Sequence, residues 1–187
     1  NPFLTPQFTW SYELTHTFKQ RYVTTLSYSK TLNNITQVIK PDPVQPNVTI
    51  QTDDNITSFE YYGATVAATV EPTKWWTSVN NLNVFYGRYT GNVADTQLDD
   101  GRVNFNVSSN NTLTLPKGWA GELNFFYQGS QLYAYMDLDP QWQLSLGIQK
   151  SLWERRGTIR FNVSDIFWTL PPSADITFTD YKERFDV

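Results

Sequence analysis

Cysteine is absent from the 187-residue chain, and histidine occurs only once. Without cysteine there is no disulfide framework, and a single histidine cannot build a zinc site of the Cys/His type. Charged residues make up 17% of the chain, below the soluble average of about 25%. The net charge of −4 gives no broad basic surface, so we expect no nucleic acid among the partners.

Long apolar runs are missing as well. No stretch approaches the roughly 18 apolar residues of a membrane-spanning helix, which excludes such a helix but not a membrane-spanning strand. The chain starts at Asn1 without an initiating methionine, and no signal peptide follows. We therefore expect a processed product or a piece of a longer protein.

Catalytic motifs are also lacking: there is no P-loop, GxGxxG, HExxH or Gly-x-Ser-x-Gly pattern. His16 falls on the apolar face of a predicted strand with no local acidic partner, so we expect an interfacial or packed residue rather than a general base. Carboxylate pairs of the kind used by calcium sites and glycosidases lie in or beside predicted loops, where they are typical of solvated acids. They are Asp53-Asp54, Asp99-Asp100 and Asp137 with Asp139. We predict neither an enzyme nor a cofactor.

Aromatic residues are abundant, at 16% of the chain, and apolar residues alternate with polar ones. In residues 141–163, apolar side chains recur at every second position from Trp142 to Ile148. The alternation resumes from Ile159 to Val163, after the polar break Glu154–Gly157. A period of two places apolar side chains on one face of a strand, so this segment predicts an antiparallel hairpin.

The same pattern recurs along the whole chain and predicts an all-β, antiparallel, up-and-down protein without helices. Most of the expected strands exceed the ~5–6 residues of a globular strand and reach the ~9–11 that a tilted strand needs to cross a bilayer. The nine segments are residues 8–18, 22–39, 57–71, 79–90, 102–114, 119–128, 140–153, 158–168 and 176–185.

The predicted connections alternate between short and long, as the periplasmic turns and extracellular loops of an outer-membrane barrel do. The short ones are residues 19–21, 72–76, 116–118 and 154–157, and the long ones are 40–55, 91–101, 129–139 and 169–175. Trp75, Trp76, Trp119 and Trp153 lie beside the short turns, where a barrel carries its interfacial aromatic girdle. Tryptophans that cap strands of a soluble sheet are the alternative.

The polar faces of the predicted strands carry a few charged residues, namely Glu13, Arg102, Glu122, Arg160 and Asp165. If these faces line a barrel lumen, the five side chains would lie in the path of a substrate or contact a plug domain. Ordinary solvated strand residues remain the alternative for each of them.

Near the two ends of the chain lie the motifs Asn1-Pro2-Phe3-Leu4-Thr5-Pro6 with Tyr12-Glu13-Leu14, and residues 144–150 and 162–167. These motifs resemble those of TonB-dependent outer-membrane receptors. The opening segment, with Asn1, Pro2 and Pro6 followed by Tyr12-Glu13-Leu14, is similar to their "NPxLxPE…YELG" segment, with Gln7 and Thr15 replacing the commoner Glu and Gly. Residues 144–150 resemble their "LdLGlrK" strand. Residues 162–167, with Asn162, Asp165 and Phe167, resemble "NVsDlF".

The resemblance implies a barrel of about 22 strands around a plug domain, with a box that engages TonB and import driven by the proton-motive force. Because neither plug nor TonB box is visible, residues 1–187 are expected to form one partial barrel domain of about nine strands. The implied location is the outer membrane of a Gram-negative bacterium. The implied partners are outer-membrane lipid, the remainder of the barrel and plug, the TonB complex through the missing N-terminal part, and an imported solute such as a siderophore or oligosaccharide.

The alternative is a soluble β-sandwich that binds carbohydrate or protein through exposed aromatic side chains. Both hypotheses predict alternating strands, but they differ over what covers the apolar faces. Packing of Leu146, Ile148, Phe161 and Val163 against a second protein layer would favour the sandwich, whereas their exposure would favour contact with acyl chains.

Overall fold

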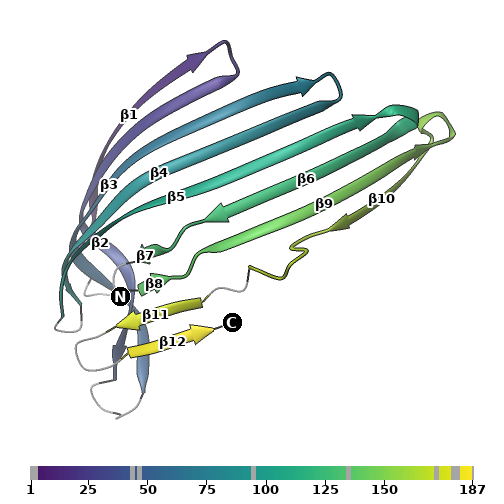
Figure 1. Ribbon diagram of the computed structural model, residues 1–187. Helices are drawn as coiled ribbons and strands as arrows, with labels where there is room; N and C mark the ends of the chain where they lie inside the picture. The colour runs from purple at the N-terminus through teal and green to yellow at the C-terminus, as the bar shows by residue number, and fades with distance from the viewer. Residues whose placement is uncertain are drawn as a thin grey trace.

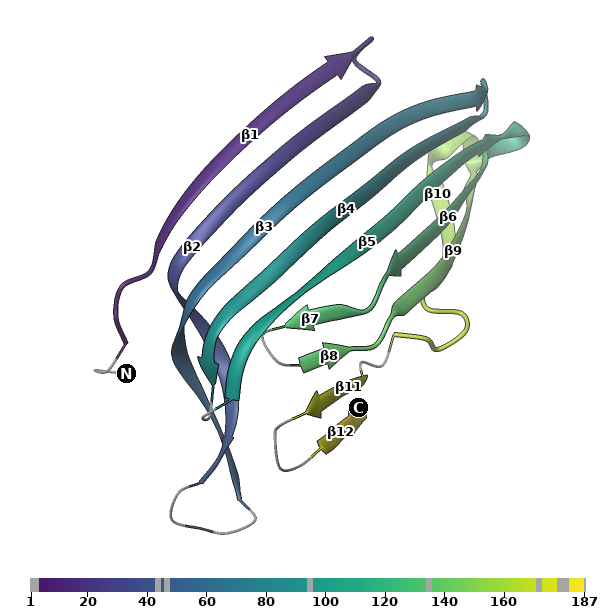
Figure 2. The same ribbon diagram turned by 60° about the vertical axis from the view of Figure 1, so that its left-hand side comes forward.

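The computed structural model describes residues 4–42, 45, 48–93, 96–133, 136–170, 173–177 and 182–186. Its main feature is an open, curved antiparallel sheet of eight long strands in the order β1-β2-β3-β4-β5-β6-β9-β10 (Figures 1 and 2). These are β1 (Phe8–Phe18), β2 (Tyr22–Pro41), β3 (Thr49–Thr73), β4 (Trp76–Val93), β5 (Thr96–Leu115), β6 (Trp119–Gln128), β9 (Gln141–Leu152) and β10 (Gly157–Val163). Each strand pairs with its successor in the chain, except that a small hairpin separates β6 from β9, so the prediction of an up-and-down sheet is confirmed.

A second, four-stranded sheet has the order β12-β11-β8-β7. Its strands are β7 (Gln131–Tyr133), β8 (Met136–Leu138), β11 (Ser173–Thr177) and β12 (Lys182–Asp186). The β7–β8 hairpin is the tip of the connection between β6 and β9, and β11 adds to β8 after the chain has left β10. The small sheet therefore lies at the end of the large sheet that holds the long connections (Figure 1).

The four short turns lie at the opposite end of the large sheet (Figure 1). Two of them contain 3-10 turns, η1 (Pro116–Gly118) and η2 (Trp153–Arg155). Lys117 and Glu154 adopt positive φ there, at 59° and 56°, which turns the chain within a few residues. In the part of the chain that the structure describes, no helix is long and apolar enough to cross a membrane.

The strand register places like side chains in rows across the sheet. Tyr12 pairs with Tyr28, which pairs with Tyr62, which in turn pairs with Tyr86, and all four therefore share a face. We call this the apolar face; it also carries Leu14, Leu26, Val66, Leu82, Val84, Val103, Phe105, Leu123, Leu146, Ile148, Phe161 and Val163. The opposite, polar face carries mainly uncharged side chains, among them Thr15, Thr25, Thr65, Asn83, Asn106, Gln128 and Gln141.

The apolar face is open to its surroundings. The exposed fractions are 45% for Leu146, 41% for Ile148, 63% for Phe161 and 38% for Val163. These four residues decide between the two hypotheses, because a sandwich would bury them under a second sheet. The soluble sandwich is therefore wrong for the sheet that the structure describes.

A small apolar cluster lies at the long-connection end, where Val38, Ile56, Tyr89 and Leu98 are buried. It forms because the alternation of β2 and β3 is interrupted. Asn33 has a φ of 51°. The register stays the same on both sides of it, but no pair of Asn33 with Thr57 forms between the pairs Leu32–Ser58 and Asn34–Ile56. Beyond this interruption Ile56 packs with Tyr89, which belongs to the polar face. The hairpin ends thus fold onto the polar side of the sheet.

The predicted strand boundaries need several corrections. The large sheet has eight strands instead of about nine, because residues 176–185 do not form one strand of it; β11 and β12 belong to the small sheet. The segment 158–168 leaves the sheet after Val163, where Asp165 and Trp168 adopt positive φ. The connections predicted at 40–55, 91–101 and 129–139 are largely strand, as β2–β5, β7 and β8 extend into them.

Candidate functional site

The predicted girdle tryptophans lie at the short-turn end of the large sheet. The rings of Trp75 and Trp76 stack, with centroids 6.4 Å apart. The Trp119 ring lies 4.9 Å from Lys150 Nζ, and Trp153 is largely exposed. This combination of aromatic rings and a cation is typical of the boundary between acyl chains and headgroups. The interfacial role of these residues stays a prediction.

A second aromatic belt crosses the apolar face nearer the long-connection end. It is the row Tyr12, Tyr28, Tyr62 and Tyr86, whose neighbouring ring centroids lie 6.3, 4.8 and 6.3 Å apart. On β4, the segment from Trp76 to Tyr86 spans about 11 residues, which is the length that a tilted strand needs to cross the hydrocarbon core. The sequence did not predict this belt, because its tyrosines are scattered over four strands and meet only through the register.

Charged side chains lie next to the tyrosine row, on its long-connection side. Lys30 Nζ lies 2.6 Å from Glu60 Oε1, and Arg88 lies 2.7 Å from Asp99 Oδ1. The hydrogen bond to Glu60 raises the pKa of Lys30 above its ordinary value, and Asp99 raises the pKa of Arg88 in the same way. Charges in this position mark the end of the apolar band.

Four of the five predicted lumen residues lie on the polar face, but in separate places. Glu13 accepts a hydrogen bond of 3.3 Å from Thr15 Oγ1. Arg160 donates to Gln149 Oε1 at 2.6 and 3.1 Å, and lines a shallow depression together with Glu122. Arg102 lies far along the sheet, in the row of Tyr61 and Gly87.

Asp165 does not line the polar face of a strand, contrary to the prediction. It follows the end of β10, and its carboxylate accepts hydrogen bonds from the Thr169 N–H at 3.0 Å and the Leu170 N–H at 3.1 Å. Its side chain also binds Thr169 Oγ1 at 3.1 Å. Asp165 therefore closes the turn that carries the chain away from the sheet.

The family-motif residues have structural positions rather than a common site. Asn1 and Pro2 lie outside the described residues. The Pro6 carbonyl accepts a hydrogen bond of 3.5 Å from Asn33 Nδ2, and Phe167 packs its ring 5.5 Å from that of Trp142. The other motif residues are Tyr12 and Leu14 on the apolar face, and Glu13 and Asn162 on the polar face.

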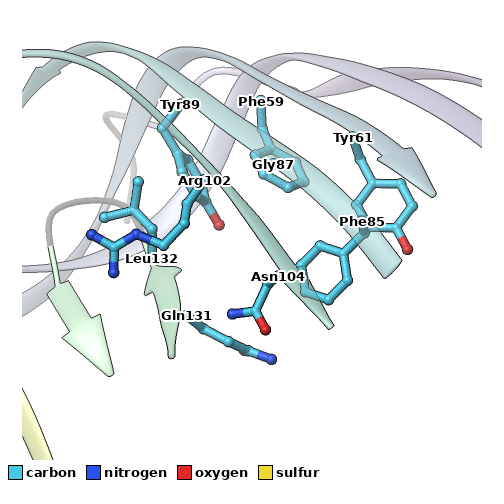
Figure 3. Close-up of a pocket in the computed structure, with 9 residues that line it drawn as sticks. All are labelled: Phe59, Tyr61, Phe85, Gly87, Tyr89, Arg102, Asn104, Gln131 and Leu132. Atoms are coloured by element: carbon cyan, nitrogen blue, oxygen red, sulfur yellow. The ribbon is translucent and has the colours of Figure 1, made fainter. Parts of the chain in front are cut away.

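A pocket of about 290 Å³ lies on the polar face at the long-connection end (Figure 3). Its aromatic wall consists of two ring pairs from neighbouring strands: Tyr61 with Phe85, at 5.5 Å, and Phe59 with Tyr89, at 4.4 Å. Arg102 and Asn104 from β5 and Gln131 and Leu132 from β7 complete the lining. The volume is close to the lower limit of the roughly 300–1,000 Å³ of small-molecule sites.

Gly87 keeps the aromatic wall accessible. It lies between Tyr61 and Arg102 in the register, and a Cβ at this position would approach Phe59 Cε2 to 3.2 Å. A larger residue would therefore push the Phe59 ring away or fill the pocket. Glycine provides the close approach of backbone and ring that this site requires.

The polar wall of the pocket is fixed by contacts between the two sheets. Arg102 reaches across to Asp137 of β8, with 2.6 Å between nitrogen and oxygen. The Asn104 amide donates to the Ser130 carbonyl, and its oxygen accepts from the Phe105 N–H at 2.6 Å. Asn104 thus holds the segment before β7 in place. Arg102 was the only pocket residue among the predicted site residues.

The acidic pairs considered in the sequence serve other contacts. Asp99 pairs with Arg88 and Asp137 with Arg102, while Asp100 Oδ1 accepts from the Gly101 N–H at 2.7 Å. Within the described ranges, no group of three or more His, Cys, Asp or Glu side chains could hold a metal ion. The expectation of no cofactor stays a prediction.

Comparison with known proteins identifies the class of this sheet. Residues 1–186 match the outer membrane protein beta-barrel family. The chain belongs to this family. No curated protein and no solved structure matches the chain. Membership of the family places the protein in the outer membrane of a Gram-negative bacterium, and the lipid environment accounts for the exposed apolar face.

Membership also assigns the two faces of the large sheet. In an outer-membrane barrel the apolar face contacts lipid and the polar face is turned to the interior. We therefore expect the aromatic pocket, which opens on the polar face, on the interior side of a barrel, at the end with the long connections. The described sheet is open, with β1 and β10 as its edges. Unpaired backbone groups cannot face acyl chains, so both edges need a partner strand in the membrane.

Proposed function

We propose that this chain forms part of a TonB-dependent outer-membrane receptor that imports a scarce solute. The observation that carries the proposal is the preformed pocket on the polar face at the long-connection end. A solute that arrives through extracellular loops would meet such a pocket before the lumen proper. The motifs around Tyr12-Glu13-Leu14 and Asn162 support the receptor class through their resemblance to its barrel strands.

The proposed role of the chain is binding and passage, without bond chemistry. The described lining of the pocket consists of four aromatic side chains, two amides, a leucine, a glycine and one guanidinium, and Asp137 balances the charge of the guanidinium. His16, the single imidazole of the chain, lies on the apolar face, where it pairs with Thr24 in the register. It is therefore separated from the pocket by the thickness of the sheet. Such a site selects a solute by shape and hydrogen bonding.

Transport is tested with the full-length protein in its own host. We expect deletion of the gene to abolish uptake of one solute from a panel of ferric siderophores and oligosaccharides. Depletion of TonB, or collapse of the proton-motive force, should abolish the same uptake while the protein stays in the outer-membrane fraction. Uptake that is lost on deletion but survives TonB depletion would contradict the proposal, because a passive channel needs no energy input.

A further inference from the structure

We infer that the pocket of Figure 3 binds one ring of a neutral saccharide. This inference rests on the proposed function and names its substrate class. It starts from the aromatic wall, in which Tyr61 and Phe85 are nearly parallel, at 26°, and half-buried. Phe59 and Tyr89 continue the wall, with an interplanar angle of 32°. Four rings on the interior side of a barrel wall are unusual, because that side is otherwise polar.

The rings interrupt a polar surface. The neighbouring row on the same face consists of Thr15, Thr25, Thr65, Asn83 and Asn106. The rings of Tyr61 and Phe85 thus form an apolar patch directly beside hydroxyl and amide groups. A ligand that fits this boundary has one apolar face and a polar rim. A pyranose ring has this character, since axial C–H groups cover the face of the ring and equatorial hydroxyl groups point outward around its rim.

The opposite wall supplies donors through Arg102, and Asp137, which pairs with Arg102 beside the wall, supplies an acceptor. Arg102 uses one guanidinium nitrogen for Asp137, and its planar fork has further N–H groups. The carboxylate of Asp137 accepts hydrogen bonds only. Their side chains are 36% and 48% exposed, and because Asp137 Oδ1 is buried against Arg102, the other carboxylate oxygen is the acceptor for a ligand. A donor beside an acceptor matches a pair of adjacent hydroxyl groups, each of which donates and accepts.

The charge of the site favours a neutral ligand. Among the described residues that line the pocket Arg102 alone is charged, and Asp137 balances it. An anionic chelate would need uncompensated positive charge to offset the loss of its hydration. The volume of about 290 Å³ accommodates a ring-sized part of a ligand, with the remainder outside the pocket.

The test measures binding of short cello-, malto-, manno- and xylo-oligosaccharides to the full-length protein in detergent, by calorimetry. We expect one of these series to bind, and Tyr61→Ala and Phe85→Ala each to weaken its binding about tenfold or more. Tyr61→Phe should retain binding, because it keeps the ring. Tyr86→Ala is the matched control, since Tyr86 neighbours Phe85 on the opposite face. Heat-modifiable migration on gels selects variants that have folded.

Salt provides an independent readout. Binding of a neutral saccharide should change little between low and high ionic strength, whereas binding of an anion to Arg102 would weaken as salt screens the charge. Failure of all four series to bind, or binding of a catecholate or indole probe that Phe85→Ala abolishes, would overturn the inference. If the protein then imports another solute in a TonB-dependent way, the proposed function is supported although the saccharide inference is rejected. Saccharide binding without TonB dependence supports the inference and contradicts the proposed function.

Discussion

At the scale of single residues, an unexpected feature is a polar network on the lipid-facing side of β4 and β5. Asn80 Nδ2 donates to Ser78 Oγ at 3.0 Å, and Ser109 Oγ donates to Asn80 Oδ1 at 2.7 Å. Asn111 continues the network, donating to Ser109 Oγ at 3.1 Å and accepting from Trp76 Nε1 at 2.9 Å. Polar groups that satisfy one another in this way cost little in an apolar environment.

Replacement of Asn111 tests this network. Asn111→Ala removes the acceptor for the Trp76 N–H and the donors for Ser109 and the Leu123 carbonyl. Because unpaired groups near acyl chains keep their full desolvation cost, we expect the free energy of unfolding to fall by about 1–3 kcal/mol. Denaturant unfolding of the full-length protein in lipid vesicles measures this change. Asn110→Ala, on the exposed polar face next to it, should have little effect, and equal losses for both variants would contradict the explanation.

At the scale of elements, the long hairpins are organised by the cluster of Val38, Ile56, Tyr89 and Leu98. It brings the ends of β2–β3 and β4–β5 together, and Leu132 of β7 packs against it. Gly91 permits the close approach, because a Cβ there would lie 2.7 Å from the Thr57 nitrogen. The cluster holds the long connections over the polar face and so gives the aromatic pocket its shape.

Truncation of the cluster should open this end of the sheet alone. Ile56 is 1% exposed, so Ile56→Ala removes buried methyl groups and costs about 2–5 kcal/mol locally. We expect faster amide hydrogen exchange in residues 34–38 and 52–58, with the strands between the aromatic belts unchanged. Ile35→Ala is the control, because Ile35 is exposed on the same hairpin. Faster exchange throughout the large sheet would show that the cluster supports the whole structure.

The sequence predicted regular alternation well and interruptions poorly. The bounds of β1 and β6 agree with the predicted segments 8–18 and 119–128, because a period of two runs through β1 and, apart from Gly121 and Phe126, through β6. The interruption at Asn33 was not predictable, since its positive φ depends on packing of the hairpin and asparagine is common throughout the chain. At three strand positions the alternation predicts a polar side chain but the residue is aromatic: Phe59, Tyr61 and Phe85. These exceptions to the pattern would have indicated the pocket.

At the scale of the whole molecule, the two faces of the sheet have opposite requirements. The apolar face between the tryptophan and tyrosine belts needs lipid, while the polar face needs water, a ligand or another part of the protein. The aromatic pocket and the buried cluster of Val38, Ile56, Tyr89 and Leu98 both lie on the polar side. Orientation of the sheet in the membrane is therefore the property on which the proposed function depends.

Adjacent residues of β4 test this orientation. Val84 lies on the apolar face and Asn83 on the polar face, both between the aromatic belts. An arginine on the lipid-facing side of a barrel costs about 2–4 kcal/mol near the bilayer midplane and less towards the interfaces, so Val84, near the tyrosine belt, falls below this maximum, whereas an arginine in the interior stays hydrated. We expect Val84→Arg to lower the folded fraction of the full-length protein in lipid vesicles, seen as loss of heat-modifiable migration, and Asn83→Arg to leave it nearly unchanged. The reverse order would mean that the polar face meets the lipid, and the assignment of the pocket to the interior would then be wrong.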